Sequence, residues 1–320
     1  MYAVAHEAWK GVMHAVVTPF DADGAIDEQA FRENIETFLS EGVHGVVVAG
    51  DNGEEWALSE HEKIVLTHLA RRIIDEAGSS AKLVVGTSAI PTAKAVDAIK
   101  HIADAGADGA MVGPPTHLVT ASLAELVTRF ETIARRGGLP LVLYNNPRRT
   151  QINLTPEIVD RLADIDGIVS IKDSVRDFAQ HSATIDRARD RINVMLGPCT
   201  QIFPAVLLGG AGYISTGPDI LGRAGVEYYD DLVAGRVEKA APIHFKLQRV
   251  YAALNGIGTW PASLKAALDL VGKRGGYPRA PILPLGPADR ERIRVALVQT
   301  GLLPGDQGSE VAAPAIAGAR

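Results

Sequence analysis

Residues 41–49 read Glu-Gly-Val-His-Gly-Val-Val-Val-Ala, and residues 105–112 read Ala-Gly-Ala-Asp-Gly-Ala-Met-Val. In both stretches a glycine stands where a helical pattern ends, and a short apolar run follows it. A run that is apolar on both faces is typical of a parallel strand covered by helices. Both stretches therefore indicate a junction between a helix and a buried parallel strand.

Eight apolar runs of this kind alternate with amphipathic stretches along the chain. We expect strands over residues 12–17, 45–49, 83–86, 109–112, 141–144, 167–171, 193–196 and 212–214. We expect helices over residues 27–40, 59–76, 92–105, 122–136, 155–163, 176–189 and 200–208. Eight regular units over about 230 residues favour an α/β fold of the (β/α)8 TIM barrel type over an open, doubly wound sheet.

Helical patterns continue beyond the last expected strand, over residues 222–234, 237–254 and 261–271. We expect the barrel to cover residues 8–235 and a C-terminal helical extension of the same unit to cover residues 236–302. Residues 303–320 are rich in Ala, Gly and Pro, which is typical of a flexible tail.

Composition excludes several classes of function. The 320-residue chain has a formal net charge of −6 and no basic cluster, so we expect no nucleic-acid partner. We find neither a signal peptide nor an apolar run of about 18 residues, so we expect no membrane span. The single cysteine, Cys199, precludes an intrachain disulfide, which fits the cytoplasmic localisation that we expect.

Active sites of such barrels lie at the C-terminal ends of the strands, and a lysine directly follows the sixth expected strand. Alternation along the strand puts Ser170 and Lys172 on one face and Val169 and Ile171 on the other, toward the helices. Lys172 then points into the barrel mouth, where desolvation lowers its pKa and frees the neutral amine as a nucleophile. A surface lysine is the alternative.

The fifth expected strand ends in Tyr144, which alternation places on the same face as Val142, toward the barrel interior. A phenol beside a lysine can relay protons, although a tyrosine with a purely packing role is the alternative. Arg149 or Arg148 can pair with a substrate carboxylate in a fork geometry, or can lie at the surface.

The second expected strand ends in Gly50-Asp51-Asn52-Gly53, a tight turn whose backbone N–H groups can bind an anion. A plain turn is the alternative. The glycines of Gly209-Gly210-Ala211-Gly212 would let a ligand approach the backbone of the eighth strand.

Together and in this order, the motifs resemble the dihydrodipicolinate synthase / N-acetylneuraminate lyase family of class I aldolases, over roughly residues 8 to 300. The matching motifs are Val17-Thr18-Pro19-Phe20, Gly50-x-x-Gly53-Glu54, Tyr144-Asn145-x-Pro147-x-Arg149-Thr150, Ile171-Lys172-Asp173-Ser174 and Gly209-Gly210-x-Gly212-x-Ile214-Ser215.

The resemblance implies a role for each matching residue. Lys172 forms an imine with a 2-oxo acid, Tyr144 relays protons and orients the substrate carboxylate, and the turn of Gly50, Asp51, Asn52 and Gly53 binds that carboxylate. The other implied substrate contacts are the Arg149 guanidinium, the Ser174 hydroxyl and the Ile214 backbone carbonyl. The resemblance also implies that no metal or organic cofactor is needed, and that the protein is a homotetramer built as a dimer of dimers.

Two stretches depart from the synthases of this family. Their Thr-Thr pair is replaced by Asp51-Asn52, and their Tyr-Tyr pair after the fourth strand is replaced by Gly-Pro-Pro-Thr-His-Leu at residues 113–118. The Asn52 amide can still donate to a carboxylate, whereas Asp51 repels one unless it is paired or turned away. Thr116 or His117 stands where the absent tyrosine would be.

We therefore expect a Schiff-base-forming aldolase or dehydratase that acts on pyruvate or a related 2-oxo acid, such as a 2-keto-3-deoxy sugar acid or an aromatic pyruvate adduct. Three alternatives stay open: a 4-hydroxy-tetrahydrodipicolinate (dihydrodipicolinate) synthase, a metal-dependent aldolase on the same fold, and a non-catalytic protein that binds 2-oxo acids. The residues expected to select the substrate are Asp51, Thr116, His117, Ser174 and Trp260.

Overall fold

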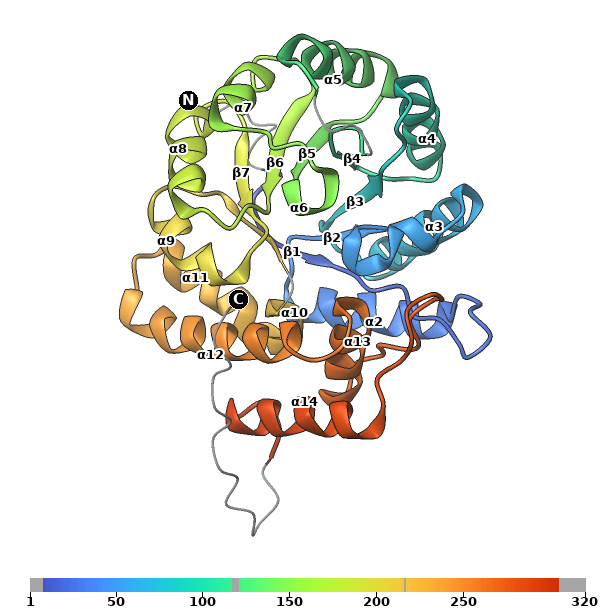
Figure 1. Cartoon of the computed structure of the whole chain (residues 1–320), viewed down its shortest axis with the longest axis vertical. Coiled ribbons are helices and arrows are strands. Elements are labelled where there is room, and N and C mark those ends of the chain that lie inside the picture. Colours follow the sequence, from blue (N-terminus) through green and yellow to red (C-terminus); the bar gives the residue numbers. More distant parts are fainter. Residues whose placement is uncertain (1–7, 117–120, 216, 305–320) are drawn as a thin grey trace.

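The protein is a closed barrel of eight parallel strands with helices around it, which confirms the predicted fold class (Figure 1). The computed structural model describes residues 8–116, 121–215 and 217–304. Each strand pairs with the next one in the chain, and β1 pairs with β8 to close the sheet. The strands are β1 (Gly11–Ala15), β2 (Gly45–Val48), β3 (Lys82–Thr87), β4 (Gly109–Val112), β5 (Leu141–Asn145), β6 (Ile168–Asp173), β7 (Asn193–Leu196) and β8 (Gly212–Ser215).

Helices follow the strands and cover the outside of the barrel (Figure 1). They are α2 (Glu28–Glu41), α3 (Glu60–Glu76), α4 (Thr92–Asp104), α5 (Leu123–Gly137), α7 (Pro156–Leu162), α8 (Phe178–Ala188), α9 (Ile202–Leu207) and α11 (Arg223–Val233). Ser59 and Glu62 form a capping box at the start of α3, and Thr155 caps α7. The short helices α6 (Pro147–Thr150) and α10 (Pro218–Leu221) carry no pattern long enough to predict them.

Side chains from all eight strands fill the barrel interior as one apolar cluster. Its buried members are Trp9, Met13, Ala15, Val47, Val84, Met111, Val142, Val169, Met195 and Ile214. Tyr144 packs against this cluster, as alternation predicts.

The prediction that Val169 faces the helices is wrong, because the pairing of β5 with β6 is irregular. Leu141 pairs with Ile168 and Val142 with Ser170, so Val169 is an extra residue of a β-bulge.

Beyond the barrel, the chain forms α12 (Val237–Asn255), α13 (Trp260–Leu270) and α14 (Pro287–Gln299). A second apolar cluster packs these three helices against Val17 and Ile220 of the barrel. The pattern of the sequence predicts α12 and α13 but not α14. Residues 305–320 of the expected tail lie outside the described residues. In the described part of the chain, no helix is both long and apolar enough to cross a membrane.

Candidate active site

The turn after β2 has an unusual backbone that depends on its neighbours. Ala49 and Glu54, on either side of the 3-10 turn Asp51–Gly53, both have a left-handed conformation, with φ of 52° and 55°. Such residues cost about 1–3 kcal/mol each unless the surroundings hold them. Gly86 of β3 leaves the room that the turn needs, because a Cβ there would lie 2.1 Å from the Ala49 carbonyl oxygen.

A buried ion pair holds the end of this turn. The Lys265 Nζ of α13 lies 2.5 Å from a Glu54 carboxylate oxygen, and the two side chains are 1% and 0% exposed. The same ammonium group donates to the backbone carbonyls of Thr18 and Tyr277, each at 2.7 Å. Glu54 also accepts from the backbone N–H of Arg279. The C-terminal extension therefore fixes the conformation of a loop at the barrel mouth.

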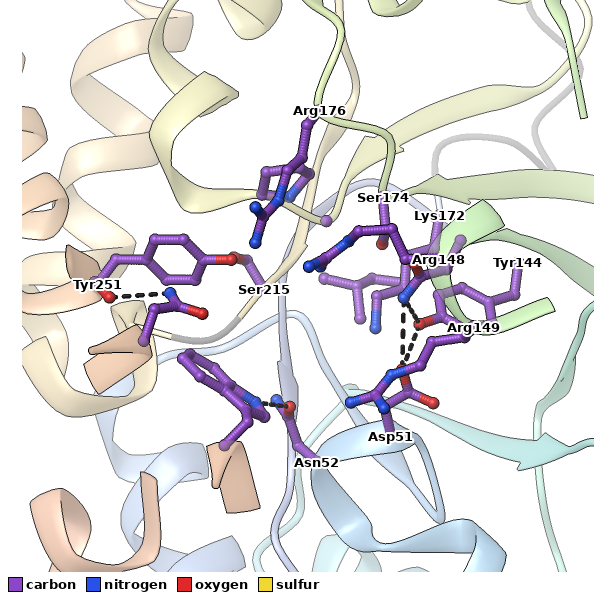
Figure 2. Close-up of a pocket in the computed structure, with 16 residues that line it drawn as sticks. Asp51, Asn52, Tyr144, Arg148, Arg149, Lys172, Ser174, Arg176, Ser215 and Tyr251 are labelled. Carbon is purple, nitrogen blue, oxygen red and sulfur yellow. Dashed lines mark hydrogen bonds and ion pairs between the residues drawn. The ribbon is translucent and has the colours of Figure 1, made fainter. Parts of the chain in front are cut away.

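A cavity of about 300 Å³ opens at the C-terminal ends of the strands, beside this turn (Figure 2). Its lining comes from strand ends and loops of the barrel and from the C-terminal extension. The residues are Asp51, Asn52, Tyr144, Asn146, Arg148, Arg149, Lys172, Ser174, Arg176, Gly197, Pro198, Ile214, Ser215, Tyr251, Asn255 and Trp260.

Lys172 is a buried amine at this cavity. It pairs with Tyr144 across β5 and β6, its side chain is 6% exposed, and its Nζ lies 4.9 Å from the centre of the Tyr144 ring. Burial lowers the pKa of Lys172 below 10.5, and the negative charge of Asp51 opposes that shift. No carboxylate among the described residues lies within ion-pair distance of this amine. The neutral, nucleophilic form is therefore favoured relative to a lysine in water.

Asp51 lines the cavity and is paired with three groups of the protein. Its carboxylate accepts a hydrogen bond from the Tyr144 hydroxyl at 2.7 Å and one from the Asn146 amide at 3.4 Å. The Arg149 Nε lies 3.4 Å from the same oxygen. Asn146 also donates to the Tyr144 hydroxyl at 2.7 Å, so the phenol oxygen is held from two sides (Figure 2).

The pKa of Tyr144 is raised well above 10, first by burial and then by the negative charge of Asp51. The phenol therefore carries its proton at neutral pH and directs it at the Asp51 carboxylate. A hydroxyl bonded to a carboxylate and close to an amine forms a chain along which a proton can move.

The C-terminal extension supplies an aromatic wall. The Trp260 indole N–H donates to the Asn52 side-chain oxygen at 2.9 Å, and the Trp260 ring meets the Tyr251 ring edge to face at 5.4 Å. Asn255 of α12 completes this side of the cavity. The sequence singled out Trp260 but not Tyr251 or Asn255, because they lie on a helix that only the tertiary fold brings to the barrel mouth.

The structure gathers most of the predicted site at this one cavity. Arg149, Ser174 and Ile214 line it beside Lys172 and Tyr144, whereas Gly50 and Gly53 frame the turn that presents Asp51 and Asn52. Thr116 is not among the described residues that line the cavity, and His117 lies outside the described residues. Among the described residues, no group of three or more His, Cys, Asp or Glu side chains is arranged to hold a metal ion.

Arg176 lines the cavity although the sequence predicts a helix from residue 176. The Asp177 side chain accepts from the backbone N–H of Ala179 and caps α8, so the helix begins only at Phe178. Arg176 is thus left in the loop after β6, from which its side chain extends into the cavity (Figure 2). A residue pattern alone does not locate this boundary.

The sequence model of the dihydrodipicolinate synthetase family matches residues 8–300. The chain belongs to this family. The 4-hydroxy-tetrahydrodipicolinate synthase of Methanothrix thermoacetophila is 32% identical over 301 residues, which are 93% of this chain and 99% of the relative. An uncharacterised DapA-like lyase of Rhizobium meliloti is 34% identical over 291 residues, which are 90% of this chain and 95% of the relative.

Solved structures of the dihydrodipicolinate synthase family share the fold. The dihydrodipicolinate synthase of Acinetobacter baumannii, solved in complex with pyruvate, superposes with a TM-score of 0.86 at 29% identity, covering 92% of this chain and 99% of that chain. As a member of this family, the protein is a lyase of the class I aldolase type, which forms a Schiff base and acts on pyruvate or a related 2-oxo acid.

Proposed function

We propose that Lys172 is the residue that forms the imine, and that Tyr144 and Asp51 move the protons of the reaction. The observation that carries this proposal is the buried Lys172 amine beside a phenol that is hydrogen-bonded to a carboxylate. A desolvated amine is the nucleophile that imine formation needs, and the phenol is the nearby acid.

The steps follow from these positions. The neutral Lys172 amine adds to the keto carbon of the 2-oxo acid, and the carbonyl oxygen takes a proton from the Tyr144 hydroxyl. The Tyr144 phenolate then takes a proton from the nitrogen and gives it to the new hydroxyl, which departs as water as a protonated C=N bond forms. The protonated imine withdraws electrons, so a proton or a carbon–carbon bond at the adjacent carbon can be lost. Asp51, bonded to the phenol, accepts and returns the proton of Tyr144.

We assign the remaining site residues to binding. The turn of Gly50, Asp51, Asn52 and Gly53 receives the keto-acid carboxylate through its backbone N–H groups, with the Asn52 amide fixed by Trp260. Arg149, Ser174 and Ile214 contact the remainder of the substrate, a 2-keto-3-deoxy sugar acid or a similar pyruvate adduct. Their places in the cavity lining support this assignment.

Exchange of the pyruvate methyl protons tests the function without knowledge of the second substrate. An enzyme that converts pyruvate to an enamine through an imine loses a methyl proton and takes up deuterium from D₂O. Proton NMR of pyruvate in D₂O is expected to show a faster loss of the methyl signal with the protein than in buffer alone. A folded protein that leaves the buffer rate unchanged at millimolar pyruvate would contradict the proposal.

Tyr144→Phe is expected to slow this exchange by about 10²–10⁴-fold, because it removes a positioned acid and base. Lys172 stays in place, so the variant is still expected to yield a borohydride-reduced adduct at saturating pyruvate. Exchange rates and the mass of the reduced protein check the two statements separately. A variant with exchange within threefold of wild type would show that Tyr144 only packs.

Asp51→Asn is expected to move the pH dependence of exchange. Only the neutral Lys172 amine attacks, so the rate rises with pH up to the pKa of that amine. The Asp51 charge raises this pKa, and its removal therefore shifts the rising limb to lower pH. Loss of the proton acceptor of Tyr144 also lowers the plateau rate. A pH profile with an unchanged midpoint would contradict the electrostatic coupling of Asp51 to Lys172.

We also propose that the protein is a cytoplasmic homotetramer built as a dimer of dimers, on the strength of its family. Light scattering coupled to size exclusion measures the assembled mass. A mass four times the 33.9 kDa of one chain is expected, and a monomer at micromolar concentration would contradict the assembly.

A further inference from the structure

Three arginines line the cavity, and two of them have no side-chain partner among the described residues. The Arg149 Nε is held by Asp51 at 3.4 Å. Arg148 of α6 and Arg176 of the loop between β6 and α8 are exposed. Within the described residues, neither guanidinium makes a hydrogen bond or an ion pair. Figure 2 shows the two side chains extending from different elements into the same cavity.

The charge of the cavity lining is opposite to that of the whole protein. Asp51 is the single acidic residue among the described lining residues, and Arg149, Tyr144 and Asn146 already share its carboxylate. The chain as a whole carries a formal net charge of −6. Two unpaired guanidinium groups at the mouth of a cavity therefore concentrate anions where the rest of the surface repels them.

We infer that Arg148 and Arg176 form a second anion subsite, which binds a carboxylate or phosphate group at the far end of the substrate. This inference rests on the proposed function, in which the keto-acid carboxylate occupies the turn after β2. Guanidinium forks match the planar oxygens of a carboxylate and those of a phosphate, and bind either group in two-point contacts. The subsite is separate from Arg149, whose guanidinium is paired with Asp51.

The size of the cavity limits what lies between the two anionic groups. The volume of about 300 Å³ lies at the lower end of the range of about 300–1,000 Å³ that is typical of small-molecule sites. A compact 2-oxo acid with an anionic group at each end suits a site of this size. Arg148 and Arg176 thus favour a doubly anionic substrate.

Borohydride trapping with matched 2-oxo acids tests the subsite. 2-Oxoglutarate and 2-oxopentanoate have the same five-carbon chain, and only the former carries a distal carboxylate. Intact-mass measurement over a concentration series gives the half-saturating concentration of each. Wild-type protein is expected to need at least tenfold less 2-oxoglutarate than 2-oxopentanoate, and R148Q/R176Q is expected to reduce this ratio at least tenfold.

Two further arms complete the experiment. R135Q/R136Q removes the same number of charges from the last turn of α5, outside the cavity, and is expected to keep the wild-type ratio. 2-Oxo-4-phosphonobutanoate carries a phosphonate in place of the distal carboxylate. A lower half-saturating concentration for it than for 2-oxoglutarate assigns the subsite to phosphate, and the reverse order assigns it to carboxylate.

The outcomes separate the subsite from the proposed function. If the wild-type protein traps pyruvate on Lys172 but shows no preference for 2-oxoglutarate, or if R148Q/R176Q keeps that preference, the subsite is wrong and the Schiff-base function stands. If the wild-type protein traps no 2-oxo acid at all, the proposed function fails and the subsite fails with it.

Discussion

Replacement of Lys172 by methionine is expected to reduce exchange of the pyruvate methyl protons to the rate in buffer, a loss of at least about four orders of magnitude. Methionine is unbranched and apolar, so it occupies much of the space of the lysine in a site that is only 6% exposed. No other described lysine lines the cavity, so the covalent route has no substitute. Proton NMR in D₂O measures the rate.

A control separates loss of the nucleophile from loss of the fold. Burial lowers the pKa of Lys172 in the folded protein below 10.5, so folding disfavours the protonated form. Stability is therefore lowest where the amine is protonated in both states, and rises with pH between the folded-state pKa and 10.5. Lys172→Met removes this penalty, so urea denaturation at neutral pH is expected to show a free energy of unfolding no lower than that of wild type.

Lys82→Met, at the opposite end of the barrel, is the matched substitution of a second lysine. It is expected to keep wild-type exchange, because Lys82 begins β3 and pairs with Asp108. Exchange above one tenth of the wild-type rate in Lys172→Met would show that another group activates pyruvate.

Replacement of Lys265 by methionine is expected to lower the free energy of unfolding by about 3–5 kcal/mol. The variant leaves the Glu54 carboxylate, which is 0% exposed, without its ammonium partner. It also leaves the carbonyls of Thr18 and Tyr277 without the donor that both share. A loss of this size is a large part of the stability of a typical domain. Urea denaturation at neutral pH measures it.

The double variant K265M/E54Q shows whether loss of the ion pair causes the loss of stability in Lys265→Met. In K265M/E54Q no buried charge is left alone, so its loss of stability is expected to fall short of the sum of the two single losses. Because Glu54 ends the turn that carries Asp51 and Asn52, both single variants are also expected to slow pyruvate exchange. A loss below about 1 kcal/mol in Lys265→Met would mean that water enters the site and solvates Glu54.

Much of the barrel could be predicted from the sequence because its signals are local. Gly42 caps the end of α2, and the apolar run from Gly45 forms β2. The capping box of Ser59 and Glu62 starts α3. Alternation along single strands also placed Tyr144 and Lys172, which the structure pairs across β5 and β6. Such features depend on a few consecutive residues, and the resemblance to the family then joined them into one site.

The remaining features depend on contacts between distant segments. Val169 enters the interior because of the irregular pairing of β6 with β5, which the sequence of β6 alone does not reveal. The Asp51 carboxylate is tolerable in the proposed anion-binding turn because Tyr144, Asn146 and Arg149 reach it from the other side of the cavity. Trp260 reaches Asn52 across 208 residues of chain, which no local pattern encodes.

Imine formation between Lys172 and a 2-oxo acid can be tested by borohydride reduction in the presence of pyruvate, which makes the bond to the lysine permanent. Intact-mass analysis followed by peptide mapping locates any adduct. One reduced pyruvate adduct per chain is expected on the peptide that contains Lys172, and no adduct is expected in Lys172→Met. An adduct on another lysine, or no adduct from a folded protein at saturating pyruvate, would contradict imine formation by Lys172.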